Sequence, residues 1–478
     1  MFDLAEAAVE GALAAGASYA DARGVVSVTE SLEARDGVLE RLAQGESAGI
    51  GVRALIGSSW GFFATPDPSP AAARRAGEEA AAIARASAMV AGPSLELAEV
   101  PVSQAHWESG WQEHPGAVSL AEKADLLVGV TEAMKRVPGV SVGEAEIDSW
   151  DTEKWFVSSQ GHRISQHIVE CGTAMSATAS GEHETQRRSY GGIGGAYGTR
   201  GYELVREADL GGNALRVADE AVALLSAPEC PSGTTDLILG SEQLALQIHE
   251  SVGHAIELDR ILGWEAAFAG TSFLEPPDLG TMRYGSELMN VTADATLPGA
   301  LGSFGYDDEG TPAQRVDIVR EGVWVGVLSG RDSAARAGLP PGGMVRADGF
   351  ARLPMVRMTN VGLLPGNSSL EAMVADTADG VYMETNRSWS IDDKRLNFQF
   401  GCEVGYEIRN GRLGRLLRNP TYTGITPAFW ASLDALGGPD EWVFWGTPNC
   451  GKGQPEQIGH TGHPAVPARF RGVRVGVH

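Results

Sequence analysis

Two histidines and a glutamate stand within one six-residue segment, at His249, Glu250 and His254. A neutral imidazole nitrogen binds zinc, and a carboxylate beside the metal can take a proton from the attacking water. Zinc also lowers the pKa of such a water toward about 7. This group of residues therefore predicts hydrolytic chemistry at neutral pH.

The two histidines are five positions apart, one more than in the common HExxH zinc motif. On a regular α-helix, side chains four positions apart lie about 40° apart around the axis, and those five apart lie about 140° apart. Two histidines at the wider angle cannot bind one ion without help. We therefore expect a π-type turn that absorbs the extra residue, with the distortion at Gly253.

A catalytic zinc commonly has three protein ligands and one open position. The candidates for the third ligand are Cys450, His460 and His463. Segment 448–453 has the composition of a turn and predicts a thiol at a loop tip, which suits a zinc ligand better than a packing residue. Terminal histidines are more often only solvated, so the sequence leaves the choice open. A mixed nitrogen and sulfur site favours zinc, although manganese or iron could substitute.

The chain has 478 residues, with 37 basic and 62 acidic side chains and a net charge of −25 at pH 7. Such a surface repels nucleic acid and anionic lipid, so we expect neither nucleic acid nor a membrane as a partner. The N-terminal segment lacks the features of a signal peptide, and no apolar run is long enough for a membrane span. We expect a cytoplasmic protein. Its other cysteines, Cys171, Cys230 and Cys402, should be buried thiols rather than disulfides.

Helix and strand signals are mixed in the first half of the chain and mostly of the strand type in the second. The expected elements of the first half are a hairpin at Asp36-Gly37, helices starting at Ser69-Pro70 and Ser119, long strands over 140–200 and a helix near 207–226. Prolines and glycine in 227–233 predict a domain boundary. We therefore expect an α+β protein with an α/β domain over 1–229, built of antiparallel sheet and helices, and a β-rich domain over 230–478 that carries the metal-binding helix, about 241–256.

Several acidic residues have two open interpretations. Glu257 and Asp259, just past the motif, could orient the histidines or simply be solvated. Segments 307–309 and 384–386 could line a cleft or cap turns. An extended peptide could add as a strand to a sheet edge, but the sequence does not identify that edge, and the substrate-binding residues stay unknown.

Several short motifs together resemble the TldD/PmbA family. In chain order they are Tyr19-Ala-Asp-Ala-Arg23, Glu33-Ala-Arg-Asp-Gly37, Gly49-Ile-Gly-Val-Arg53, Trp60-Gly-Phe-Phe-Ala-Thr65, His249-Glu-Ser-Val-Gly-His254, Gly302-Ser-Phe-Gly-Tyr-Asp-Asp-Glu-Gly310, Glu384-Thr-Asn386 and Asn449-Cys-Gly451. Each motif is weakly specific, and their common order is strongly specific. The resemblance runs from about residue 5 to 475.

The resemblance implies a zinc metalloprotease of the TldD type, which carries HExxxH, rather than a motif-lacking TldE/PmbA subunit. It implies His249, His254 and Cys450 as ligands of one zinc ion per catalytic chain and Glu250 as the catalytic carboxylate. It also implies unfolded or small, sometimes modified, peptides as substrates. The expected assembly is a dimer, either of identical chains or with a TldE/PmbA-type paralogue.

Two other functions fit the same residues. Sulfur is common in closed structural zinc sites, so the chain could be a non-catalytic peptide-binding or regulatory subunit. Zinc chemistry does not itself choose the acyl group, so small amides are a further substrate class. Replacement of Glu250 and a comparison of peptides with small amides separate these alternatives.

Overall fold

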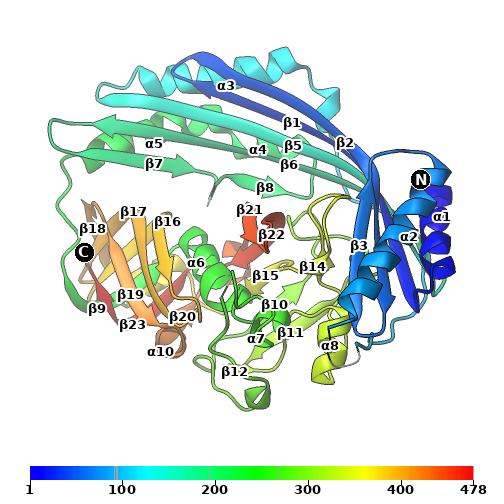
Figure 1. Ribbon diagram of the computed structural model, residues 1–478. Helices are drawn as coiled ribbons and strands as arrows, with labels where there is room; N and C mark the ends of the chain where they lie inside the picture. The colour runs from blue at the N-terminus through cyan, green and yellow to red at the C-terminus, as the bar shows by residue number, and fades with distance from the viewer. Residues whose placement is uncertain (91, 93–94, 193, 269, 477–478) are drawn as a thin grey trace.

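The structure is a computed structural model that describes residues 1–90, 92, 95–192, 194–268 and 270–476. Its first part is a long, mostly antiparallel sheet that spans the molecule as an upper layer (Figure 1). Its strands are β1 (Tyr19–Arg35), β2 (Val38–Ile56), β3 (Ser59–Thr65), β4 (Gln104–Glu108), β5 (Val140–Ser158), β6 (Arg163–Ser180), β7 (Thr185–Tyr190) and β8 (Ala196–Gly198). The order is β3-β2-β1-β5-β6-β4, and β7 and β8 also pair with β6.

Local sequence accounts for the turns and helix starts of this part. Asp36 and Gly37 both have positive φ, 50° and 84°, and close the predicted hairpin between β1 and β2. The Ser69 hydroxyl accepts a hydrogen bond from the Ala72 amide, and Ser119 caps the next helix in the same way. The predicted hairpin and both helix starts are therefore confirmed.

Helices α3, α4 and α5 cover the outer face of the sheet, and α1 and α2 pack at one end (Figure 1). Their bounds are α1 Phe2–Ala14, α2 Pro70–Ser87, α3 Leu120–Lys135, α4 Glu203–Ala208 and α5 Leu210–Leu224, with a 3₁₀ turn η1 at Pro115–Ala117. The single helix expected near 207–226 is wrong in detail. Asp209 takes a left-handed conformation, φ 45°, which breaks the helix in two, and its carboxylate caps α5.

The C-terminal part is built around a sheet in which β16, β9, β23, β19 and β17 form a closed ring. Closure follows because β16 also pairs with β17, and it leaves these strands without a free edge in the ring. The strands of this sheet are β9 (Gly233–Leu239), β16 (Asp379–Ile391), β17 (Asn397–Arg409), β18 (Arg412–Leu417), β19 (Thr421–Ile425), β20 (Leu433–Leu436) and β23 (Ala468–Val475). We call everything from β9 onward the C-terminal body.

Smaller elements pack beside this ring and share one apolar core with it. The strands are β10 (Val291–Asp294), β11 (Arg315–Arg320), β12 (Val323–Trp324), β13 (Val345–Arg346), β14 (Met355–Val356), β15 (Val361–Leu363), β21 (Val443–Lys452) and β22 (Gln457–Ala465). The helices and turns are α6 (Ser241–Ile248), η2 (His249–Gly253), α7 (Leu258–Ile261), η3 (Pro276–Asp278), α8 (Arg331–Ala337), α9 (Leu370–Ala375), α10 (Thr426–Ala431) and η4 (Pro439–Glu441). The predicted α+β class is confirmed, and the division at residues 229 and 230 stays a prediction.

Buried ion pairs join the first sheet to the C-terminal body. Arg53 contacts Glu309 at 3.1 Å, and Arg23 contacts Asp308 at 3.2 Å, with all four side chains at most 4% exposed. Removing one partner of such a pair leaves a buried charge uncompensated, which is strongly destabilising. Segment 307–309 therefore anchors the sheet, while the Asp307 carboxylate also accepts amide hydrogen bonds from its own turn.

Among the described residues, none of the helices combines the length and the apolar character that a bilayer crossing requires.

Candidate metal centre

The motif helix widens into a π turn at the predicted place. Helix α6 ends at Ile248, and residues His249–Gly253 form the π turn η2. The amide of His254 donates to the carbonyl of His249, five positions earlier, at 3.1 Å. This hydrogen bond puts the two histidines in the relation that residues four apart have on an α-helix. The predicted distortion is confirmed.

The surroundings hold this wide turn in place. The buried Tyr284 hydroxyl donates to the carbonyl of Ser251 at 2.5 Å and satisfies a group inside the turn. A Cβ atom on Gly253 would lie 2.1 Å from Sδ of the buried Met358. The close approach of Met358 therefore leaves no room for a side chain at position 253, where we expected the distortion.

Three potential ligand atoms meet at this turn. One atom each of His249, His254 and Cys450 lies within 4.8 Å of the other two, and the distance from His254 Nε2 to Cys450 Sγ is 3.8 Å. All three residues are about 5% exposed. The structure thus brings together the two motif histidines and the cysteine, one of three candidates for the third ligand.

The expected loop-tip position of Cys450 is wrong. Cys450 lies within strand β21, pairs with Gly459 of β22 and is buried. The register of the two strands shifts between Thr447 and Cys450, so the turn-like residues serve a bulge rather than a loop. The other three cysteines are buried free thiols, as predicted.

His463 orients the first histidine rather than joining the ligand group. Its Nδ1 faces the carbonyl of Val361 at 3.0 Å, and a carbonyl only accepts, so the proton of His463 is on Nδ1. Its Nε2 is then an acceptor, and His249 Nδ1 donates to it at 2.7 Å. Nε2 of His249 is left with the lone pair that a metal requires.

Glu257 orients the second histidine in the same way. Its carboxylate lies 3.0 Å from Nδ1 of His254, which leaves Nε2 of His254 facing Cys450. Burial raises the pKa of Glu257, but Lys452, His254 and Arg260 more than offset it and hold the pKa well below its usual value. Of the two open acidic positions, Glu257 therefore contacts a histidine of the motif.

Asp259, the second open position, neutralises a buried lysine instead. Its carboxylate accepts from Lys452 Nζ at 2.8 Å and 2.9 Å. Burial raises the pKa of Asp259 to about 6, although Lys452 opposes this shift. Neither acidic residue is solvated.

Burial keeps the histidines neutral and the neighbourhood favours the thiolate. Burial is the main cause that lowers the pKa of both His249 and His254. Burial alone would raise the pKa of Cys450, but His254 and Arg357 outweigh it, and the pKa of the thiol lies below its ordinary value. Neutral imidazole and thiolate are the forms that bind a metal.

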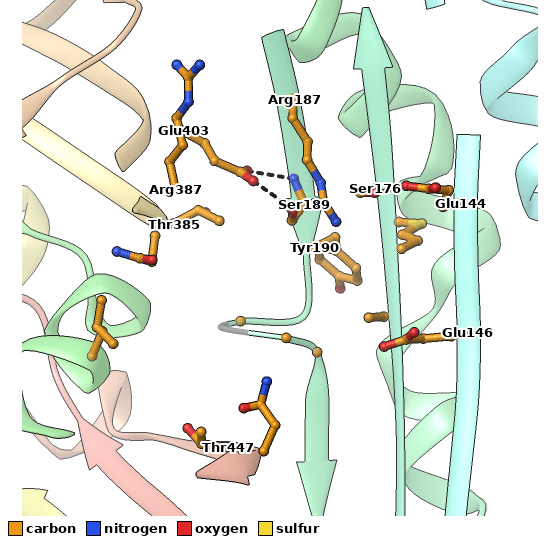
Figure 2. A pocket seen from close by; sticks show the side chains of 18 of the residues that line it. Glu144, Glu146, Ser176, Arg187, Ser189, Tyr190, Thr385, Arg387, Glu403 and Thr447 are labelled. Carbon is orange, nitrogen blue, oxygen red and sulfur yellow. Dashed lines mark hydrogen bonds between the residues drawn. The ribbon is translucent and has the colours of Figure 1, made fainter. Parts of the chain in front are cut away.

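Glu250 faces a cavity of about 890 Å³ that the ligand group also lines. The cavity lies between the C-terminal body and the first sheet, which contributes Glu144 and Glu146 on the opposite side (Figure 2). The Glu250 carboxylate accepts a 2.5 Å hydrogen bond from Arg395 Nη1. Nothing in the spacing of the sequence relates Arg395 to the motif, 145 positions earlier.

Segment 384–386 has a mixed role. Thr385 and Asn386 line the cavity, whereas the Glu384 carboxylate binds the Tyr382 hydroxyl. Close by, Glu403 of β17 accepts from the amide and hydroxyl of Ser189 on β7, which ties the sheet to the C-terminal body at the cavity (Figure 2).

A second group of potential ligands lies on the first sheet, at His114, Asp151 and His167. Its groups are already paired with one another. His114 Nδ1 accepts from the Gly116 amide, so its Nε2 carries the proton and donates to Asp151 at 3.1 Å. His460, a third-ligand candidate, is engaged by Glu170 at 2.9 Å on the sheet side and is not in the ligand group.

Three family profiles cover most of the chain. Residues 20–84 match PmbA/TldA metallopeptidase domain 1, residues 113–227 its central domain and residues 232–476 its C-terminal domain. The chain belongs to the PmbA/TldD metallopeptidase family. The predicted resemblance is confirmed.

Individual members of the PmbA/TldD family give the same result. A metalloprotease of Methanothermobacter thermautotrophicus is 30% identical over 96% of this chain and 95% of its own length. A zinc metalloprotease TldD homolog of Saccharolobus solfataricus is 28% identical over 41% of this chain and 42% of its own. TldE from Thermococcus kodakarensis has a similar fold, with TM-score 0.72 and 14% identity over 99% of this chain and 100% of its own. The chain is therefore a member of a metallopeptidase family, and its fold is that of the family.

Proposed function

We propose that this chain is a zinc-dependent peptidase of the TldD type that hydrolyses unfolded or small, sometimes modified, peptides. The observation that carries the proposal is the ligand group itself: two histidines with Nε2 available and one cysteine, beside a carboxylate that faces a large cavity. A relative that is called a zinc metalloprotease supports the choice of metal.

The residues fit zinc in chemistry and in spacing. In a tetrahedral site with bonds of about 2.0 Å to nitrogen and 2.3 Å to sulfur, these two atoms lie about 3.5 Å apart. The 3.8 Å between His254 Nε2 and Cys450 Sγ is close to this value. His249, His254 and Cys450 would hold one ion per chain, with His463 and Glu257 fixing the two rings.

Glu250 is the proton carrier of the proposed reaction. Zinc held by the three ligands would supply a Lewis acid that polarises the scissile carbonyl and favours ionisation of a water. Glu250 takes one proton from the attacking water as its oxygen bonds to the carbonyl carbon. Glu250 then returns that proton to the amide nitrogen as the C–N bond breaks, so that one peptide and one water give an acid and an amine.

The alternative of a non-catalytic subunit with a structural metal is less well supported by the geometry. A closed structural zinc site has four protein ligands. Within the part of the chain that the structure describes, the group at the π turn has three, and Glu250 beside it lines the cavity.

Replacement of Glu250 by Gln tests the proposal. The variant should keep its fold and one zinc per chain and lose peptide hydrolysis, measured by circular dichroism, elemental analysis and cleavage of a peptide pool. Cleavage at the parent rate would assign the base to another residue. Cleavage of small amides in preference to peptides would change the substrate class, and elemental analysis of the native protein decides between zinc, manganese and iron.

The proposed assembly is a dimer, of identical chains or with a TldE/PmbA-type paralogue. Apolar side chains on the β1–β2 hairpin support a partner surface, since Val28, Val38 and Leu42 are 45–62% exposed. Light scattering of the purified chain, alone and with such a paralogue, distinguishes the two forms.

A further inference from the structure

The turn between β16 and β17 holds Arg395 in an uncommon backbone conformation. Its φ is +63°, a left-handed value that glycine or asparagine adopts more readily than arginine. The amide of Arg395 donates to the carbonyl of Asp392 at 2.8 Å, and its carbonyl accepts from the Thr426 hydroxyl at 2.8 Å. Such a conformation at a cavity points to a role for the side chain that it presents.

The guanidinium of Arg395 lies beside the group that performs the proposed chemistry. Nη1 donates to Glu250 at 2.5 Å, the side chain is 17% exposed, and Arg395 lines the same cavity as the three ligands. Its Nε–H is buried and has no hydrogen-bond partner within the described part of the chain. A buried donor without an acceptor is costly, and an incoming acceptor would remove that cost.

We propose that Arg395 is a catalytic residue that stabilises the oxyanion of the substrate during peptide hydrolysis. This inference rests on the proposed function. A guanidinium has five N–H donors and stays charged, so one group can hold Glu250 through Nη1 and still donate to the substrate.

The charge in the reaction develops within reach of this group. When the water oxygen bonds to the scissile carbon, the C=O π electrons move onto the carbonyl oxygen, which becomes an oxyanion, and Glu250 carries the water proton. Arg395 donates a hydrogen bond to that oxygen and transfers no proton. When the C–N bond breaks, the C=O bond re-forms and the proton on Glu250 goes to the leaving nitrogen. Arg395 therefore stabilises a charge that exists only in the addition step. This stabilisation lowers the free energy of the transition state and leaves that of the bound substrate unchanged, so the reaction is faster.

A substrate carboxylate is the other anion that Arg395 could bind, and the two roles differ in measurable ways. A carboxylate anchor acts on the ground state, so its removal raises KM for peptides with a free C-terminus. An oxyanion donor acts in the transition state, so its removal lowers kcat equally for peptides with free and with amidated C-termini.

The test compares Arg395→Gln and Arg395→Lys with Lys394→Gln. Lys394 is an exposed cation in the same turn, outside the cavity lining, and is the control for loss of one charge. The substrates are N-acetylated fluorogenic peptides with free or amidated C-termini. The ligand is a phosphinic peptide, whose tetrahedral anionic phosphorus group resembles the addition intermediate, titrated into each zinc-loaded protein by calorimetry.

We expect Arg395→Gln to lower kcat about 100-fold to 1,000-fold with KM within about threefold, since removal of one oxyanion donor has this effect. Phosphinic peptide binding should weaken by a similar factor, and Arg395→Lys should recover part of both losses. Lys394→Gln should match the parent. A kcat of Arg395→Gln close to that of the parent, or a loss confined to KM for free C-termini, overturns the proposal.

Two further results distinguish failure of this proposal from misfolding of the variant and from failure of the proposed function. If Arg395→Gln loses zinc or its fold, Arg395→Lys decides, because it keeps the charge at the turn. If the parent binds the phosphinic peptide but cleaves none of the peptides, the proposed function fails and the inference fails with it, whereas peptide hydrolysis that the parent and Arg395→Gln perform at the same rate overturns the inference alone. Equal phosphinate binding by parent and Arg395→Gln overturns it.

Discussion

Two groups of side chains in the described part of the chain have the residue types of a metal site, one at the π turn and one on the first sheet. They differ in where their lone pairs are directed. His249 and His254 donate outward, to His463 and Glu257, and keep Nε2 for a metal. His114 and His167 instead face Asp151 with Nε2. Residue type and proximity are therefore insufficient, and the partners of the second ring nitrogen decide which group is ready to bind.

The largest expected effect is that of the sulfur ligand. Cys450→Ser should weaken zinc binding by more than the roughly 100-fold that loss of an outer partner causes, and should abolish hydrolysis, since a serine hydroxyl is a poor zinc ligand. Competition with a chelating dye measures the affinity. The matched change on the sheet, His167→Gln, should leave zinc stoichiometry and affinity unchanged. Loss of one zinc in His167→Gln instead would reverse the comparison.

The outer partners should matter less, but only at the π turn. Glu257→Gln should weaken zinc binding about 10-fold to 100-fold, because it removes the carboxylate that orients His254. Asp151→Asn, which removes the corresponding carboxylate on the sheet, should have no effect on affinity. Equal effects in the same dye competition would mean that both groups bind metal.

The backbone of the two regions can be compared through two glycines. Gly253→Ala should lower the free energy of unfolding by about 1–3 kcal/mol, because its Cβ would overlap the buried Met358. Gly129→Ala, at an exposed position of helix α3 where a Cβ atom would have no neighbour within 4 Å, should raise the free energy of unfolding by about 0.5–1 kcal/mol. Urea unfolding of both variants measures whether each substitution lowers or raises the free energy of unfolding. A neutral Gly253→Ala would show that the wide turn adapts.

The smallest expected effect is a pH dependence of stability that comes from the first sheet and not from the metal centre. Burial and the neighbouring Asp148 raise the pKa of Glu146 on β5 to about 7. Its folded pKa lies above its unfolded value, so its contribution to stability is full below about pH 4.5 and is lost as pH rises through 7. The free energy of unfolding of the metal-free protein should fall by the order of 1 kcal/mol as pH rises over this range. The effect is this small because residual solvent screens the group. Glu146→Gln should flatten it.

Zinc affinity should change with pH in the opposite direction, because its ligands must lose protons before they bind. A parallel pH dependence of zinc affinity and metal-free stability would contradict the assignment of the stability change to Glu146.

The parts of the site that could be predicted are those encoded by short spacing. The five-residue interval between the histidines, with Gly253 inside it, was enough to predict the π turn. Cys450 was among the candidates, but its place in a strand was missed because a β-bulge uses the same glycine and asparagine as a loop. The fold class and the Asp36-Gly37 hairpin followed from local signals, whereas the helix break at Asp209 did not, since a left-handed aspartate leaves no pattern in hydrophobic periodicity.

Contacts between residues that are far apart in the sequence could not be predicted. The sequence offers His463 as a candidate ligand, and only its hydrogen bond to His249 shows that it orients a ligand instead. Arg395 gave no signal at all, because a basic residue in a polar turn is usually solvated. A hairpin prediction places such a residue at a tip but does not say what the tip contacts.

The closed ring of strands has a mechanical consequence for Arg395. Its turn is rooted in β16 and β17, which pair with each other and, through β9, β23 and β19, back around the ring. Because the ring leaves neither strand a free edge within it, sliding of β16 or β17 would break hydrogen bonds on both sides of that strand, so the base of the turn is stiff. We expect Arg395 to keep its position when substrate binds. Any motion that opens the cavity to a peptide should come from the first sheet, on the opposite side.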